Sequence, residues 1–142
     1  MKFNSFNQTH IGDLQSIVSP DRFSIGESNL DLHGKDQSRY PLCPPEAVIW
    51  PINRSEVSEI LRYANRHLIP VTGWGSGSSL AGNPIPVKRG VVLNFSQMNH
   101  ILEIREEDFQ ADVEPGVIYQ DLNEKLRHKG LFFTPDPGSK AT

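Results

Sequence analysis

Residues 71–83, which read V-T-G-W-G-S-G-S-S-L-A-G-N, constrain the fold of this chain more than any other stretch. They continue a short apolar segment and contain four glycines and three serines but no lysine or arginine. Glycine lets the backbone lie flat against a ligand, and successive main-chain amides aimed at one point bind phosphate oxygens without a formal positive charge. The segment therefore predicts a loop that holds a diphosphate with its N–H groups.

Two familiar phosphate-binding motifs do not fit this loop. A P-loop requires Lys and then Ser or Thr after its last glycine, whereas Gly82 is followed by Asn83. The dinucleotide-binding fingerprint requires a third glycine three positions after the second, where this chain has Ser78 or Leu80. An ordinary turn-rich surface loop remains the alternative, because clusters of Gly and Ser are common in turns.

Length, charge and cysteine content exclude several classes of function. The 142 residues suffice for one domain, and the formal net charge of −3 with dispersed Lys and Arg argues against a nucleic-acid partner. Apolar runs are only a few residues long and residues 1–4 open no secretory signal, so we expect a cytoplasmic protein without a membrane span. Because Cys43 is the single cysteine, we expect neither an internal disulfide nor a metal site.

Hydrophobic spacing before the glycine loop predicts a βαβ unit. Residues 46–51 form an apolar run between prolines, as in a buried strand, and residues 69–71 form a second short strand. Between them, Ser55 is the expected N-cap of a helix with one apolar stripe. The stripe consists of Val57, Ile60, Leu61 and Ala64. The two strands should be parallel, with a right-handed crossover.

Antiparallel strands and a second helix are expected after the loop. Residues 91–95 predict another buried strand, and two apolar runs at 101–104 and 109–113, separated by charged residues, predict a hairpin. A helix over residues 118–129 should end at Gly130.

The segment before the βαβ unit gives a weaker pattern. Residues 9–18 have helical spacing with Thr9 as the expected N-cap. The polar stretch that follows, up to Asp36, reads as an irregular connection.

Five pieces of the sequence occur in the order typical of one flavoprotein family. They are P-E-A-V-I-W-P with its following helix, I-P-V leading into G-W-G-S-G-S-S-L-A-G-N, V-V-L-N-F, A-D-V-E-P-G-V and F-F-T-P-D-P-G-S-K-A-T. On these pieces the chain resembles the first part of the FAD-binding domain of FAD-linked oxidoreductases of the vanillyl-alcohol-oxidase and para-cresol-methylhydroxylase (PCMH) type. Its resemblance is closest to the D-lactate dehydrogenase and glycolate oxidase branch.

The resemblance implies an α+β fold of PCMH type that is incomplete relative to the family. Residues 1–35 are expected to be an N-terminal helical and irregular segment, and residues 36–142 the first part of the FAD-binding domain. The second half of that domain and the substrate domain would then lie outside this chain. A separate chain that supplies the second half is a candidate partner.

FAD is the cofactor that the resemblance implies. In the family, the loop matching residues 73–79 surrounds the pyrophosphate with backbone amides, and Gly82 and Asn83 close it. Pro51 and the Pro115-Gly116 turn match positions near the nucleotide, although a strand terminator and a plain tight turn are the alternatives. The implied cofactor-binding residues are Pro51, Gly73, Trp74, Gly75, Ser76, Gly77, Ser78, Ser79, Gly82, Asn83, Pro115, Gly116, Pro135, Asp136, Pro137, Gly138 and Ser139. Trp74 stands where Arg or Gly is frequent, so only stacking or packing is expected of it.

Oxidation of a 2-hydroxy acid such as D-lactate or glycolate is the activity that the resemblance implies. The five histidines are each isolated in the sequence, so we assign no catalytic residue. Arg39 and Tyr40 could approach a substrate, but a salt bridge within their loop, near Asp36, is the stronger expectation. We therefore expect an FAD-binding portion that is inactive alone. A stand-alone nucleotide-binding or interaction module and a nonfunctional truncated remnant remain alternatives.

Overall fold

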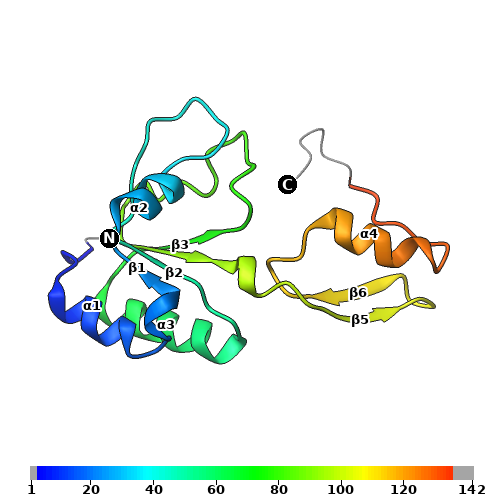
Figure 1. Cartoon of the computed structure of the whole chain (residues 1–142), viewed down its shortest axis with the longest axis horizontal. Helices are drawn as coiled ribbons and strands as arrows, with labels where there is room; N and C mark the ends of the chain where they lie inside the picture. Colours follow the sequence, from blue (N-terminus) through cyan, green and yellow to red (C-terminus); the bar gives the residue numbers. More distant parts are fainter. Residues whose placement is uncertain (1–2, 136–142) are drawn as a thin grey trace.

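A four-stranded sheet forms the centre of the larger of two lobes in the computed structural model, which describes residues 3–135 (Figure 1). Its strands are β1 (Phe23–Ser24), β2 (Ala47–Ile49), β3 (Val71–Trp74) and β4 (Val91–Asn94), in the order β1-β2-β4-β3. Both β2 and β3 run parallel to β4, whereas β1 pairs antiparallel with β2. The predicted parallel orientation of the two strands is confirmed, but the second strand is Val71–Trp74 rather than residues 69–71, and β4 lies between the two. All four β4 residues are buried, as expected for a central strand.

Helices cover both faces of this sheet. Helix α1 (Gln8–Gln15) and helix α3 (Arg54–His67) lie on one side, and α2 (Glu27–His33) lies on the other (Figure 1). Leu14 from α1 and Ile60 from α3 are fully buried in one core with residues of the sheet. Helix α3 begins after Asn53, whose side chain accepts the amide of Glu56, so the predicted cap at Ser55 was wrong. Leu61 is 45% exposed and lies outside the buried stripe.

The N-terminal segment is more ordered than its sequence suggested. The N-cap of α1 is Asn7 rather than Thr9, and its side chain accepts the His10 amide while the imidazole of His10 accepts the Asn7 amide. The expected irregular connection contains a 3₁₀ turn (Pro20–Arg22), β1 and α2. Strand β1 has two residues, and it exists because Phe23 pairs with Ile49 across the sheet. A strand this short leaves no periodic pattern.

The smaller lobe consists of a hairpin and one helix. Strands β5 (Ile101–Arg105) and β6 (Gln110–Val113) pair antiparallel, as predicted, and α4 (Tyr119–Arg127) buries Leu122 and Leu126. Gly130 has a left-handed backbone (φ 69°), and the amide of Leu131 returns to the carbonyl of Leu126 at 3.2 Å. Gly130 therefore closes α4 as expected, although the helix is Tyr119–Arg127 rather than residues 118–129. The α+β fold class is confirmed.

Two stretches of chain, residues 98–100 and 114–116, run side by side between the lobes. The Gly116 amide donates to the carbonyl of Met98 at 2.8 Å, and the Glu114 amide donates to the carbonyl of His100 at 2.9 Å. The carboxylate of Glu114 also accepts the amide of His100 at 2.9 Å. These bonds extend the hairpin toward the larger lobe (Figure 1).

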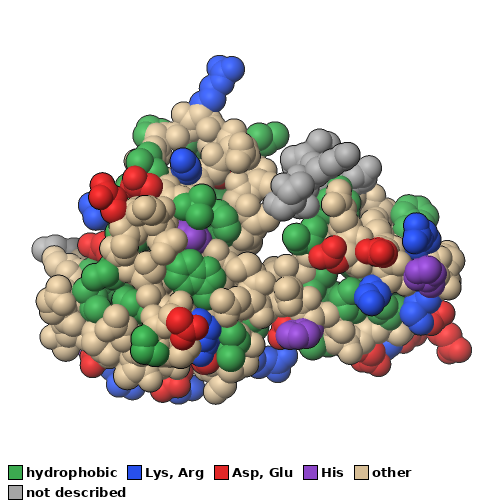
Figure 2. All heavy atoms as spheres, viewed as in Figure 1, with side chains coloured by type: hydrophobic (Ala, Val, Ile, Leu, Met, Phe, Trp, Pro, Cys, Tyr) green, Lys and Arg blue, Asp and Glu red, His purple; other side chains and the backbone are tan. Residues whose placement is uncertain are grey.

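The surface carries mixed charges. Figure 2 shows acidic and basic side chains interspersed on both lobes of the visible face. Within residues 3–135, none of the helices is both long enough and apolar enough to cross a membrane.

Candidate cofactor-binding site

The glycine loop follows β3 at the carboxyl end of the parallel strands, where open α/β sheets bind ligands. It surrounds a hollow of about 270 Å³. The lining residues are Gly73, Gly75, Ser76, Gly77, Ser78, Ser79, Asn83 and Pro84. Cavities for drug-sized ligands measure about 300–1,000 Å³, so this hollow suits part of a large cofactor rather than the whole. Seven of the nine loop residues singled out in the sequence thus share one hollow.

The first limb of the loop, residues 76–79, has amides that bond no described protein group. Among the described residues, no protein group accepts a hydrogen bond from the amides of Ser76, Gly77, Ser78 or Ser79. The hydroxyls of Ser76 and Ser78 lie 3.0 Å apart. Consecutive free amides around a hollow are the elements of an anion site. On the return limb, residues 80–83, the amide of Gly82 by contrast donates to the side chain of Asp36. Gly82 therefore shapes the loop rather than offering a donor to a ligand.

The indole of Trp74 packs against the loop at Gly77. Gly77 has a left-handed backbone (φ 69°), and a Cβ there would lie 2.3 Å from Cζ2 of the Trp74 indole. The indole Nε1 is buried and has no hydrogen-bond partner within residues 3–135. The indole therefore leaves no room for a side chain at position 77, so this contact requires glycine. Residues 76–79 would hold the phosphates of a diphosphate ligand.

His33 packs against the indole of Trp74. Its ring centroid lies 4.4 Å from that of Trp74, and only 1% of the residue is exposed. Nδ1 bonds the carbonyl of Asn29 at 2.8 Å, and Nε2 lies 2.7 Å from the side-chain nitrogen of Asn94. Since Asn94 accepts the Ser96 amide with its oxygen, its nitrogen donates to Nε2 and the imidazole is neutral. Burial lowers the pKa of His33, against the opposing effect of its bond to Asn29.

The sequence missed this support. His33 was taken as isolated, but Asn94 is its partner 61 residues away. The salt bridge expected within the loop of Arg39 and Tyr40, near Asp36, is also wrong. The carboxylate of Asp36 instead accepts the amides of Ser38 and Gly82. Its bond to Ser38 forms an Asx turn, which the D-x-S pattern at positions 36–38 could have indicated.

Phe95 brings the other predicted segment to the loop. Its ring lies 3.3 Å from the position of a Cβ on Gly73, and its carbonyl oxygen lies 2.0 Å from that of a Cβ on Gly116. The Pro115-Gly116 turn therefore packs on the chain leaving β4, and Pro115 is exposed.

The remaining predicted residues lie apart from the hollow or outside the description. Pro51 is fully buried two residues after the end of β2. Pro135 is exposed at the end of the described chain. Asp136, Pro137, Gly138 and Ser139 lie outside the described residues.

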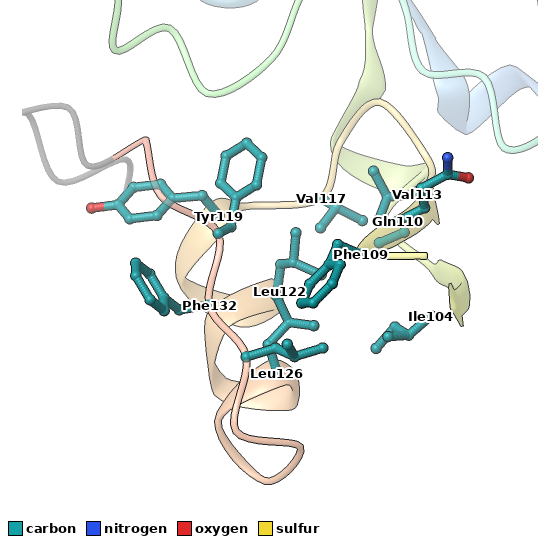
Figure 3. Close-up of a pocket in the computed structure, with 12 residues that line it drawn as sticks. Ile104, Phe109, Gln110, Val113, Val117, Tyr119, Leu122, Leu126 and Phe132 are labelled. Atoms are coloured by element: carbon teal, nitrogen blue, oxygen red, sulfur yellow. The ribbon is translucent and has the colours of Figure 1, made fainter. Parts of the chain in front are cut away.

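A second, apolar hollow lies on the smaller lobe. It measures about 310 Å³ between the hairpin and α4, and Figure 3 shows Phe109, Leu122 and Leu126 among the side chains around it. Its lining is mostly aliphatic and aromatic, which suits packing rather than an anion. The glycine loop is therefore the better candidate for a diphosphate.

Comparison with known families identifies the family to which the chain belongs. A family model described as an FAD binding domain matches residues 45–142. The chain belongs to this FAD-binding domain family. FAD is thus its cofactor, as the resemblance implied.

Curated relatives include three enzymes. The chain is 39% identical over 126 residues to the glycolate oxidase subunit GlcD of Bacillus subtilis, covering 89% of the chain and 27% of the relative. It is 31% identical over 132 residues to a probable mitochondrial D-lactate dehydrogenase of Danio rerio, covering 93% and 27%. For the D-2-hydroxyglutarate dehydrogenase of Stutzerimonas stutzeri, the identity is 30% over 126 residues, covering 89% and 27%. The chain therefore spans about a quarter of the length of these relatives.

Solved structures agree on the fold of the FAD-binding domain. Alkyldihydroxyacetonephosphate synthase superposes with a TM-score of 0.84 at 20% identity, covering 99% of this chain and 30% of that protein. For p-cresol methylhydroxylase the TM-score is 0.74 at 24% identity, covering 85% of this chain and 24% of that protein. The predicted PCMH-type fold is thereby confirmed.

Proposed function

We propose that this chain is the FAD-binding portion of a flavin-dependent oxidoreductase that oxidises a 2-hydroxy acid such as D-lactate or glycolate. The observation that carries the proposal is the set of free amides at residues 76–79, which line the hollow of the glycine loop. The substrate class is supported by relatives named for glycolate, D-lactate and D-2-hydroxyglutarate. In this proposal residues 36–142 are the first part of the FAD-binding domain, preceded by residues 1–35.

The chain's own residues would bind and orient the cofactor. Amides at residues 76–79 would offset the diphosphate charge with main-chain dipoles, and Gly77 lets this part of the loop pack closely on the Trp74 indole. Pro51, the Pro115-Gly116 turn and residues 135–139 are proposed to lie along the nucleotide. When bound, FAD supplies the hydride acceptor for alcohol oxidation.

Catalysis is proposed to need groups beyond this chain. Removal of a hydroxyl proton requires a base, and a 2-hydroxy acid carries a carboxylate that a cation would hold. Among the described residues, the hollow at the glycine loop is lined by no histidine, lysine or arginine. We therefore propose that the chain binds FAD but does not turn over substrate by itself.

The test is an assay of the protein as isolated from the cells that produce it. Its native mass shows whether a second polypeptide accompanies the 15.9 kDa chain. D-lactate, glycolate and D-2-hydroxyglutarate should each be tested for bleaching of the flavin absorbance without oxygen, with p-cresol as the control substrate. If a second polypeptide accompanies the chain, bleaching by a hydroxy acid and not by p-cresol is expected, whereas the chain alone should bind FAD without bleaching. Bleaching by p-cresol alone, or an assembled complex whose flavin no hydroxy acid reduces, would refute the substrate class, and the second result would favour a nucleotide-binding module.

A cytoplasmic location is part of the proposal. The zebrafish relative is named as mitochondrial, so location has to be measured directly. Cell fractionation should place the protein with cytoplasmic markers, and recovery with an organelle or membrane fraction would contradict this.

A further inference from the structure

The return limb of the glycine loop is held by the segment that follows α2. Oδ2 of Asp36 accepts the amide of Gly82 at 2.8 Å, and the amide of Gln37 donates to the carbonyl of Ser79 at 3.0 Å. The other carboxylate oxygen, Oδ1, accepts the amide of Ser38 at 2.8 Å, which fixes the direction of the carboxylate. Figure 1 shows the two segments side by side above the sheet, in cyan and green. Two bonds therefore attach the loop to a neighbouring part of the chain.

The backbone at Gly82 is shaped for this contact. Gly82 has φ 78°, and a Cβ there would lie 2.7 Å from Cδ2 of the Tyr40 ring. Tyr40 thus covers Gly82 while Asp36 bonds its amide. The amide of Ala81 donates to the hydroxyl of Ser79 at 3.1 Å, so the donors at positions 81 and 82 are both used within the protein. Neither of these two amides is available to a ligand.

We infer that Asp36 is a positioning residue for FAD: by bonding Gly82 it holds the return limb in place, so that the amides of residues 76–79 surround one hollow. The inference rests on the proposed binding of the FAD diphosphate by this loop. A carboxylate would repel a diphosphate, and both of its oxygens are engaged by main-chain amides, so Asp36 acts through the loop rather than on the ligand. Burial opposes ionisation of Asp36, but hydrogen bonds from Ser38, Gly82 and Ser79 outweigh it and lower its pKa.

The test compares three variants of the full 142-residue chain. D36A removes both acceptors, whereas D36N keeps the size of the side chain and one acceptor oxygen. D31N is the matched control, because within the described residues the carboxylate of Asp31 makes no hydrogen bond or ion pair. Affinity for FAD is measured by fluorescence anisotropy, and the order of the loop is measured without FAD by hydrogen–deuterium exchange of peptides covering residues 75–84.

D36A should weaken FAD binding about tenfold, since one hydrogen bond to a charged group contributes free energy of this order. D36N should lie between D36A and the wild type, and D31N should bind as the wild type does. Exchange of the loop peptides should be faster in D36A, with exchange of β2 and β4 unchanged. If D36A does not fold, the same comparison is read from D36N.

Three results would overturn the inference. The first is FAD affinity equal in D36A and wild type. The second is weaker binding without faster exchange of the loop, because Asp36 would then act in another way. The third, a wild-type chain that binds no FAD, would refute the loop as the diphosphate site itself. Failure of the hydroxy-acid assay would refute only the proposed substrate class and leaves these affinity ratios unaffected.

Discussion

Gly77 lies so close to the indole of Trp74 that a Cβ on it would come within 2.3 Å of the ring carbon Cζ2. The left-handed backbone at Gly77 adds strain for any other residue. At Gly75, by contrast, a Cβ would meet no atom within 4 Å. The two glycines of the same loop therefore differ in what they tolerate.

Replacing Gly77 by Ala should weaken FAD binding at least about tenfold, because the loop has to move off the indole and its amides lose their common direction. Gly12→Ala, in α1 and outside the lining of the hollow, is the control and should change the affinity less than about twofold. Titration of both variants with FAD, followed by flavin fluorescence, checks this. Equal affinities for the two variants would show that the close contact with Trp74 does not shape the site.

Protonation of His33 should destabilise the fold at mildly acidic pH. Burial lowers its pKa from the ordinary 6.5, so the unfolded chain binds the proton more tightly than the folded chain. The contribution of the neutral imidazole is therefore fully present above pH 6.5 and is lost as pH falls through the lower folded-state value. Urea unfolding at a series of pH values from about 8 to about 5 should show this slope. His33→Gln should reduce the slope and His128→Gln should keep it; an unchanged slope in His33→Gln would contradict the assignment.

Arg22 and Glu56 tie the 3₁₀ turn to the first turn of α3. The guanidinium binds the carboxylate through two hydrogen bonds of 2.5 and 2.9 Å, and the side chains are only 11% and 14% exposed. Glu56→Ala should lower the free energy of unfolding by about 2–3 kcal/mol, because it leaves a mostly buried cation without its partner. Glu59→Gln, on the exposed face of the same helix, should change it by less than about 0.5 kcal/mol.

The same pair gives an acid-dependent signature. Hydrogen bonds from Arg22 lower the pKa of Glu56 below its ordinary 4.5. Its contribution to stability is thus present above pH 4.5 and is lost as pH falls through the folded-state pKa. Urea unfolding of Glu56→Ala should show a smaller loss of stability below pH 4.5 than the wild type, and an equal loss would mean that this pair does not control acid stability.

Gly116 marks the junction between the lobes. A Cβ there would lie 2.0 Å from the carbonyl oxygen of Phe95 and 2.8 Å from that of Met98, and both neighbours are backbone atoms. Gly116→Ala should therefore cost about 1–3 kcal/mol of stability. Gly12→Ala, inside α1 with nothing within 4 Å, should instead stabilise the chain by roughly 0.5–1 kcal/mol. Thermal unfolding of both variants distinguishes them, and a neutral Gly116→Ala would show that the junction adjusts freely.

Features encoded by local patterns were predictable from the sequence. The runs that became β2 and β4 are short and apolar apart from Asn94, as buried parallel strands are, and the charged residues 105–108 mark the turn between the two strands of the hairpin, although Arg105 is itself the last residue of β5. Gly130 closes α4 as expected, because glycine adopts a left-handed backbone without steric cost.

Long-range arrangement was not predictable. Nothing local to β4 shows that it enters between β2 and β3, and β1 is too short to leave a pattern. The bonds of His33 to Asn94 and of Asp36 to Gly82 span 61 and 46 residues, so a single sequence offers no signal that joins the partners. The contact of Trp74 with Gly77 spans three residues, but it depends on which way the indole turns after the strand ends. For residues 136–139, the role toward FAD stays a prediction.

Amide proton and nitrogen chemical shifts, recorded by NMR while the chain is titrated with FAD, test most directly whether residues 76–79 bind the diphosphate. Riboflavin, which has the same ring system without phosphate, is the matched control ligand. FAD should shift the amides of Ser76, Gly77, Ser78 and Ser79 together with the indole Nε1–H of Trp74, and riboflavin should leave these signals unmoved. Shifts confined to other parts of the chain, or equal shifts with riboflavin, would contradict the assignment of this loop as the site that binds FAD.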